Sequence, residues 1–346
     1  MTLDPGGLLY AAKWNTGSMT GDKTLMQSVN GGWLYLAANA TYTRTDGGGG
    51  LRYGDTNTPI AEGDVIRAGQ KLFANPGTYV FTETQRKPVE VMPATPGQLD
   101  AQNWLRATLT KYGQSYDTVM ELPFDIDSRN ATNMYAMFYS CTALTSVPQM
   151  DTGKVTDMAF MFDGCSALTT VPQLDTRNVT NMYQMFQNCT ALTSVPQMDT
   201  GKVTDMRFMF NGCAKLRTAP QMDTGSVTTM RTMFQECSSL TSVPQMDTSK
   251  VQDMAYMFNR CSALTSAPKM NTSQVTTMRT MFQNCSSLTF VPEMDTQNVT
   301  EMDWMFNGCP KLTDGNASLT IKRKGATTTN MIAYSGLTRE PFLTIE

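Results

Sequence analysis

The sequence predicts a small N-terminal β domain followed by a curved repeat solenoid of eight 24-residue units. Two observations carry this prediction. Each cysteine of the chain lies 24 residues after the previous one, and a fixed period of this length is the signature of a repeat fold. The first 87 residues show no such period and are rich in Gly, Thr and Asn. The eight cysteines are Cys141, Cys165, Cys189, Cys213, Cys237, Cys261, Cys285 and Cys309.

One repeat unit follows the pattern L-x-x-V-P-x-M-D-T-x-x-V-x-x-M-x-x-M-F-x-x-C-x-x, which starts at Leu144 and is preceded by a degenerate first copy. In the second half of the unit, apolar residues fall at positions i, i+3, i+4 and i+7, namely Met158, Met161, Phe162 and Cys165. This spacing puts them on one face of a helix. The second half therefore predicts a short helix or 3₁₀ coil.

The first half of the unit predicts a very short strand at Leu144–Val147, because Pro148 follows it directly. Proline has no N–H to donate to a sheet, so we expect a sheet only about two or three residues wide. Asp151 and Thr152 then favour an Asx turn, which satisfies free backbone N–H groups before the helix. The aspartate column could also bind calcium, but the glycine-rich repeat of calcium-binding β-rolls is absent.

Stacking is what gives such units a core, because a single unit has one apolar stripe and nothing to bury it against. Parallel strands stack about 4.8 Å apart, whereas packed helices need about 8–10 Å between their axes. We therefore expect the helical side to splay and the strands to line the concave face. This is the geometry of a leucine-rich repeat in which methionine and phenylalanine replace much of the leucine.

The repeats also resemble a known family. The run Asn178-Val-Thr-Asn-Met-x-x-Met-Phe-x-x-Cys-x-x-Leu192 is similar to the BspA-like leucine-rich repeats of bacterial surface proteins, which also occur in phage virion proteins. The resemblance covers about Met120 to Leu312 and departs from the family by a shortened, proline-containing strand region. It implies a surface-exposed binding protein and says nothing about residues 1–98.

The remaining segments predict an attachment domain and two ends for the solenoid. Residues 1–87 contain strand-like runs between glycine-rich turns and predict a β-sandwich or barrel that attaches the protein or makes it oligomeric. Residues 88–98 contain three prolines and predict a semi-rigid linker. Residues 99–119 predict a helical cap with Asp100 as N-cap and with Trp104 and Leu105 covering the first unit. The units occupy 120–311, and residues 312–346 predict strands, at 317–322 and 342–346, that close the other end.

Composition argues against several classes of function. A net charge of −3 and a pI near 5.2 do not suit a nucleic-acid-binding protein. The chain has no histidine, which excludes Ser-His and Cys-His catalytic pairs and leaves the cysteines without the usual partners of a zinc site. We expect the cysteines to form a ladder of buried structural thiols, with no cofactor, no metal and no enzymatic activity. The sequence shows no membrane span, and its start does not resemble a secretory signal.

Two surfaces are candidates for binding. Before the Met-Phe pair, alternate units carry an aromatic residue, and the units between carry Gln184, Thr232 and Thr280. This stripe is either a row of platforms for sugar rings or a protein partner, or a result of crowding, in which a large side chain fits only every second unit. The stripe comprises Phe160, Phe208, Tyr256 and Trp304. The predicted concave face, which could bind glycans or peptides or could be a solvated sheet, comprises Gln149, Gln173, Gln197, Gln221, Gln245, Lys269 and Glu293.

The sequence thus favours a non-enzymatic interaction protein on a phage virion, on the tail or as a head decoration. Its N-terminal domain would contact other virion proteins, and its solenoid would bind a host-surface glycan or protein. We expect a homo-oligomer. The alternatives are a structural head decoration or cement protein without a host ligand, and a bacterial cell-surface adhesin.

Overall fold

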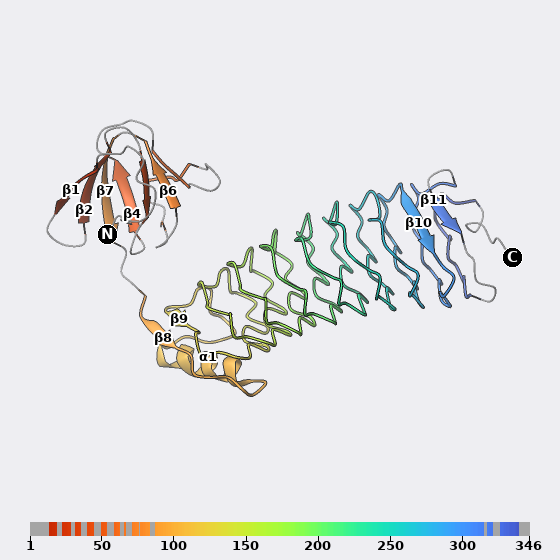
Figure 1. Cartoon of the computed structure of the whole chain (residues 1–346), viewed down its shortest axis with the longest axis horizontal. Coiled ribbons are helices and arrows are strands. Elements are labelled where there is room, and N and C mark those ends of the chain that lie inside the picture. The colour runs from red at the N-terminus through yellow and green to blue at the C-terminus, as the bar shows by residue number, and fades with distance from the viewer. Residues whose placement is uncertain are drawn as a thin grey trace. The chain divides into compact units, whose positions relative to one another are not determined.

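The structure is a computed structural model that describes residues 14–18, 23–28, 32–35, 40–44, 50–53, 59–62, 66, 71–75, 77–83, 87–314, 317–320 and 326–338. The chain divides into two compact units, Met1–Pro88 and Val89–Glu346, which are described separately (Figure 1). Within the described residues, no helix has both the length and the apolar character that crossing a membrane requires.

The first unit contains two antiparallel sheets. The larger sheet has the order β1 (Trp14–Ser18), β2 (Lys23–Ser28), β7 (Gly77–Glu83) and β4 (Ala40–Arg44). The smaller sheet has the order β3 (Gly32–Tyr35), β6 (Lys71–Ala74) and β5 (Leu51–Tyr53). The buried core of this unit includes Tyr42, Leu51, Ile60, Ile66, Leu72 and Tyr79.

Of the segment predicted as a linker, 88–98, Pro88 ends the first unit and residues 89–98 belong to the second. Strand β8 (Val89–Val91) pairs in parallel with β9 (Asp125–Asp127). Thr95 is fully buried, and its hydroxyl accepts hydrogen bonds from the N–H groups of Thr132 and Asn133 and donates to the Asn133 carbonyl. The three prolines therefore shape an ordered segment that is hydrogen-bonded along its length. The sequence interpretation was wrong because proline spacing does not reveal such long-range bonds.

Helix α1 (Asp100–Lys111) follows this segment. Asp100 is not the N-cap but the first helical residue, and its carboxylate accepts a 2.7 Å hydrogen bond from the Gly97 N–H. Leu105 is fully buried, and the Trp104 ring lies edge-on to Phe124, with ring centroids 6.2 Å apart. Both residues that the sequence indicated thus pack at the start of the stack, Trp104 against Phe124 of the degenerate first copy and Leu105 in the core.

The repeats form a stack of 24-residue turns, which we call rungs, running from α1 toward β10 and β11 (Figure 1). A column of parallel bridges joins successive rungs at equivalent residues. The column runs through Asn133, Asp157, Asn181, Asp205, Thr229, Asp253, Thr277, Glu301 and Thr327. A repeat solenoid is therefore present, and its bridge column continues past 311 into the segment predicted to close the stack.

Each rung forms neither a regular helix nor a continuous 3₁₀ coil, the two structures predicted for it, although some of its backbone bonds are of the 3₁₀ type. Residues 158–165 form consecutive turns in which the backbone N–H groups alternate between two kinds of partner. The N–H groups of Phe160 and Phe162 donate to carbonyls of the next rung, each at 2.9 Å, whereas Asp163 and Cys165 donate to the carbonyl three residues back. A helix would use every N–H within the rung, and the ladder between rungs could not form. The apolar spacing is the same in both structures because the turns also point these side chains inward.

Two residues of each rung adopt the left-handed conformation that makes these turns possible. Phe160 has a φ of 58° and Gly164 a φ of 76°, and the equivalent positions of the other rungs repeat these values closely. Such a backbone costs a non-glycine residue roughly 1–2 kcal/mol. The ladder bonds on either side offset this cost, since the N–H groups of both residues donate to the next rung.

The first half of each unit, where a short strand was predicted, lies on the side of the rung opposite the turns and is less regular than predicted. Only β10 (Val291–Asp295) is a strand there in the later rungs, and it pairs in parallel with β11 (Ala317–Thr320). Elsewhere a backbone bond joins alternate pairs of rungs, as from the Thr193 N–H to the Thr169 carbonyl at 3.0 Å. Without packed helices on one side and a sheet on the other, the predicted cause of curvature, with strands on the concave face, is absent. The predicted strand at 342–346 lies outside the described residues.

The core of the stack consists of columns of identical side chains. Fully buried phenylalanine rings lie face to face along the whole array, with centroids 5.4 to 5.8 Å apart and nearly parallel planes. Methionine columns fill the space around them, as Met158 and Met161 illustrate, both fully buried. Each rung thus buries its apolar surface mainly against its two neighbours.

Candidate binding surfaces

The four aromatic residues of the predicted stripe occupy one structural position. Each sits at the first left-handed residue of its rung, with φ between 58° and 62°, and each is partly exposed. On the intervening rungs the same position holds Gln184, Thr232 and Thr280. The stripe residues Phe160, Phe208, Tyr256 and Trp304 therefore point from equivalent backbone positions, two rungs apart.

The intervening rungs also carry large side chains on this surface, but one position earlier in the rung, directly before the left-handed residue. The Tyr135 and Tyr183 rings each lie 5.2 Å from the Phe160 ring, and Tyr183 lies 5.9 Å from Phe208. Farther along, the Arg231 guanidinium lies over the Tyr256 ring, 5.4 Å from its centroid. We call this surface the turn row; it comprises Tyr135, Phe160, Tyr183, Phe208, Arg231, Tyr256, Arg279 and Trp304.

This arrangement explains why the stripe alternates. A flat side chain from the neighbouring rung lies beside each ring of the first four rungs, so two large groups at the left-handed position of adjacent rungs would compete for one space. These contacts agree with the crowding explanation in the first four rungs, and all four stripe rings stay partly exposed. Sequence reasoning missed Tyr135, Tyr183, Arg231 and Arg279 because it compared one position only. The position before it carries a large side chain on each intervening rung and a small one, Ala159 or Ala255, on two of the stripe rungs.

Carboxylates accompany the rings. Three residues before each stripe residue lies an acid, in the order Asp157, Asp205, Asp253 and Glu301. Asp205 forms an ion pair with Arg207, at 2.6 Å, and Arg207 in turn lies over the Tyr183 ring, 5.1 Å from its centroid. Asp253 pairs with Arg231 across rungs at 3.4 Å. The turn row therefore combines aromatic faces with fixed carboxylate and guanidinium groups.

The residues predicted for the concave face form the second surface. All seven are exposed, and the first four line two open grooves of about 560 and 590 Å³. Their amides also join the rungs: Gln149 Nε2 donates to the Gln173 carbonyl at 2.7 Å, and Gln173 Nε2 donates to the Gln197 carbonyl at 2.7 Å. These glutamines therefore take the place of a backbone ladder on this side of the stack. The seven are Gln149, Gln173, Gln197, Gln221, Gln245, Lys269 and Glu293.

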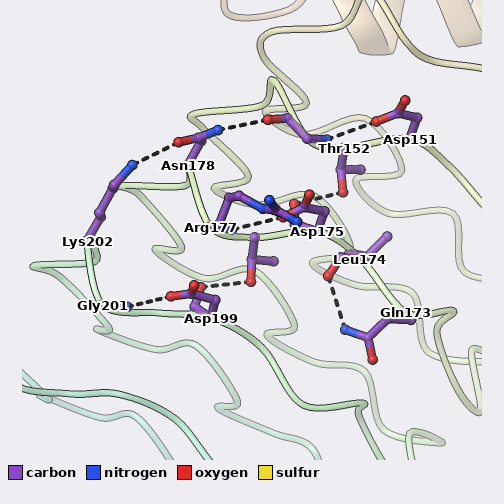
Figure 2. A network of polar contacts seen from close by, with 12 residues as sticks. Asp151, Thr152, Gln173, Leu174, Asp175, Arg177, Asn178, Asp199, Gly201 and Lys202 are labelled. Atoms are coloured by element: carbon purple, nitrogen blue, oxygen red, sulfur yellow. Dashed lines mark hydrogen bonds and ion pairs between the residues drawn. The ribbon is translucent and has the colours of Figure 1, made fainter.

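Members of the aspartate column line the same grooves. Figure 2 shows three of them, Asp151, Asp175 and Asp199, with their polar contacts. The Gly201 N–H donates to Asp199 Oδ1 at 3.2 Å, and the same Asx turn recurs in the other rungs, as the sequence predicted. The buried Thr152 hydroxyl donates to the Asp175 carbonyl of the next rung at 2.9 Å. The column is thus a turn-forming and rung-joining device, which agrees with its repetition on every rung.

Comparison with known proteins identifies the family. Residues 122–222 and 217–319 match the family described as "Mycoplasma protein of unknown function, DUF285". The chain belongs to this family. A solved leucine-rich repeat protein from Eubacterium ventriosum is similar to it at 14% identity, over 75% of this chain and 91% of that chain, with a TM-score of 0.30. No curated protein matches the chain.

In this DUF285 protein the eight cysteines are buried, and their thiols are hard to ionise. Each thiol from the second rung onward donates to a phenylalanine carbonyl of the preceding rung, as Cys165 does to Phe138 at 3.0 Å. Burial raises the pKa of the Cys141 and Cys309 thiols to about 12. Across the described part of the chain, no group of three or more cysteine or acidic side chains is placed to hold a metal ion. The thiols therefore act as small core residues with one hydrogen bond each.

Proposed function

We propose that this DUF285 protein is a non-enzymatic interaction protein, displayed on a phage particle, whose repeat stack presents a binding surface on the side of the turns. One observation carries the proposal. The core columns repeat the same residues rung after rung, whereas the turn row changes from Tyr and Phe to Arg, Tyr and Trp along its length. Repeat proteins use a constant framework in this way to carry a variable binding surface.

The first unit would serve attachment. It has its own buried core and two sheets, separate from the repeat stack, so it can contact other virion proteins or form a homo-oligomer while the stack faces outward. Attachment through one unit and binding through the other would multiply the effective affinity, because many copies on one particle would engage the same surface.

A second candidate is an adhesin of the bacterial cell surface. The family resemblance of the repeats to BspA-like proteins of bacterial surfaces supports this candidate, and the description of the matching family names a bacterium but no location. The virion protein and the adhesin would use the same binding surface. They differ in whether the first unit is attached to a phage particle or to the bacterial cell. A purely structural cement protein is the third alternative, in which the turn row packs on a shell and binds no host.

Antibody labelling tests whether the protein is located on the phage particle or on the bacterial cell surface. Cells of the bacterium that carries the gene, and particles released from them, are labelled with an antibody to the purified full-length chain and viewed by electron microscopy. Label on particles, together with binding of those particles to host cells that the free chain inhibits, supports the proposal. Label on intact cells alone supports the adhesin, and label on particles whose binding the chain does not inhibit supports the cement protein.

A further inference from the structure

We infer that the turn row is a binding site for a neutral, linear polysaccharide lying along the axis of the stack. The inference rests on the proposed function in one respect, that the chain binds a surface, and it adds the site and the chemical class of the ligand.

The period of the row selects a ligand that itself repeats. Four rings at the left-handed position recur every second rung, which makes three such steps from Phe160 to Trp304, and the core rings of neighbouring rungs lie 5.4 to 5.8 Å apart. A globular partner has no translational repeat and could use only part of such a row. A linear polymer with a constant monomer length can meet each step of the row in the same way, and its affinity then grows with its length.

The chemistry of each step suits a sugar. A pyranose ring packs its C–H face on an aromatic ring and directs its hydroxyl groups outward to hydrogen-bonding side chains. Each stripe ring has a carboxylate three residues before it, as Asp157 precedes Phe160, and Asp157 Oδ1 is held by the Ala159 N–H at 2.9 Å. The other oxygen of Asp157 has no partner in the described part of the chain and can accept from a hydroxyl group.

The two ion pairs in the middle of the row favour a neutral polymer. The Arg207 guanidinium is paired with Asp205, and Arg231 is paired with Asp253. Each pair presents both donors and acceptors while its net charge is zero. A polyanionic or polycationic ligand would have to break these pairs, whereas neutral hydroxyl groups can bond to either partner without separating them.

The rings are held in place before any ligand arrives. The Phe160 and Phe208 backbones are fixed by bonds from their own N–H groups to the next rung, at 2.9 and 3.2 Å, and Tyr183 lies between their two rings. Binding therefore orders few side chains, so little conformational entropy is lost when the ligand binds.

The test measures binding of full-length protein to cellohexaose, chitohexaose and maltohexaose by titration calorimetry, with the matching disaccharides for comparison. We expect at least one hexaose to bind, at least roughly tenfold more tightly than its disaccharide. The double variant Phe208→Leu, Tyr256→Leu keeps apolar volume but removes two aromatic faces, and it should weaken that binding by about tenfold or more. Its melting temperature reports whether the stack stays folded.

The matched control is Phe290→Leu, because Phe290 is another exposed aromatic residue, 48% exposed, and lies outside the turn row. It should bind the hexaose like the parent protein. Binding by none of the sugars at millimolar concentration would overturn the inference, as would equal loss in both variants or affinity that does not depend on length.

A cell-binding assay separates this inference from the proposed function. If the chain still binds cells whose glycans were oxidised with periodate, but not cells treated with protease, the ligand is a protein; the polysaccharide inference then fails while the interaction function stands. If the chain binds neither untreated cells nor particles, the proposed function itself fails.

Discussion

The Cys213 thiol donates a 3.1 Å hydrogen bond to the carbonyl of Phe186, which lies in the preceding rung. The same bond joins each successive pair of rungs, so the column of cysteines is bonded to the column of phenylalanines along the array. A cysteine fits this position because it is small, tolerates full burial and still has one weak donor.

The thiols should therefore be unreactive while the stack is folded. Burial raises the pKa of Cys141 to about 12, and the other thiols are shifted in the same direction, so little thiolate exists at pH 8. Iodoacetamide labelling followed by mass spectrometry should show none of the eight cysteines modified before unfolding, and all eight modified in urea. Rapid labelling of one cysteine in the native protein would show that its rung is open.

Stability should depend on the contact between neighbouring rungs. Met209 is fully buried, and Met209→Ala should lower the free energy of unfolding by about 2–5 kcal/mol. Because each rung packs mainly on its two neighbours, hydrogen exchange should also quicken in the rungs before and after it. Met120→Ala is the control, since Met120 is 64% exposed and its loss should change stability little. Faster exchange at residue 209 alone would contradict the stacked-core interpretation.

The repeat period allowed the stack, its core columns and the Asx turns to be predicted, because each depends on the residues of one unit. The conformation of residues 158–165 could not be predicted in the same way. Met158, Met161, Phe162 and Cys165 point inward both in a helix and in the observed turns. The two structures differ in where the backbone N–H groups donate, and that depends on the neighbouring rung. The left-handed φ of Phe160 is also unexpected for an aromatic residue.

The candidate binding surfaces could be predicted only in part, because contacts between neighbouring rungs cannot be read from one unit. The stripe and the glutamine column follow from single positions of the unit, whereas contacts such as Tyr183 with Phe208 join different positions of two rungs. The sequence also gave no sign that Val89–Val91 would pair with Asp125–Asp127, because that parallel pairing joins segments separated by a helix.

Two glutamines of identical position allow the rung-joining bonds to be tested. Gln173 Nε2 donates to the Gln197 carbonyl at 2.7 Å, whereas the amide of Gln197 has no partner in the described part of the chain. Gln173→Ala should therefore lower the free energy of unfolding by about 0.5–1.5 kcal/mol. Gln197→Ala, at an equally exposed site, should have little effect on urea unfolding. Equal effects would show that these bonds add nothing to the stack.

Asp163 should make the stack less stable as the pH rises. It is only 7% exposed and lies in a column whose equivalent residues are mostly amides, such as Asn211 and Asn259. Burial raises its pKa to about 6, opposed in part by a hydrogen bond with Asn188. In the unfolded chain the pKa is near 3.8, so between about pH 4 and pH 6 the folded state binds more protons than the unfolded state.

The stability that this group contributes is thus complete below about pH 4, falls as the pH rises to about 6 and is constant above that. Urea unfolding should show a loss on the order of 2 kcal/mol across this interval. Asp163→Asn should remove that loss and be more stable than the parent at pH 7.5. The reciprocal variant Asn259→Asp puts a carboxylate at an equivalent position, 4% exposed, and should add a second loss of the same sign. If Asp163→Asn unfolded with the same pH dependence as the parent, the ionisation of Asp163 would not be coupled to folding.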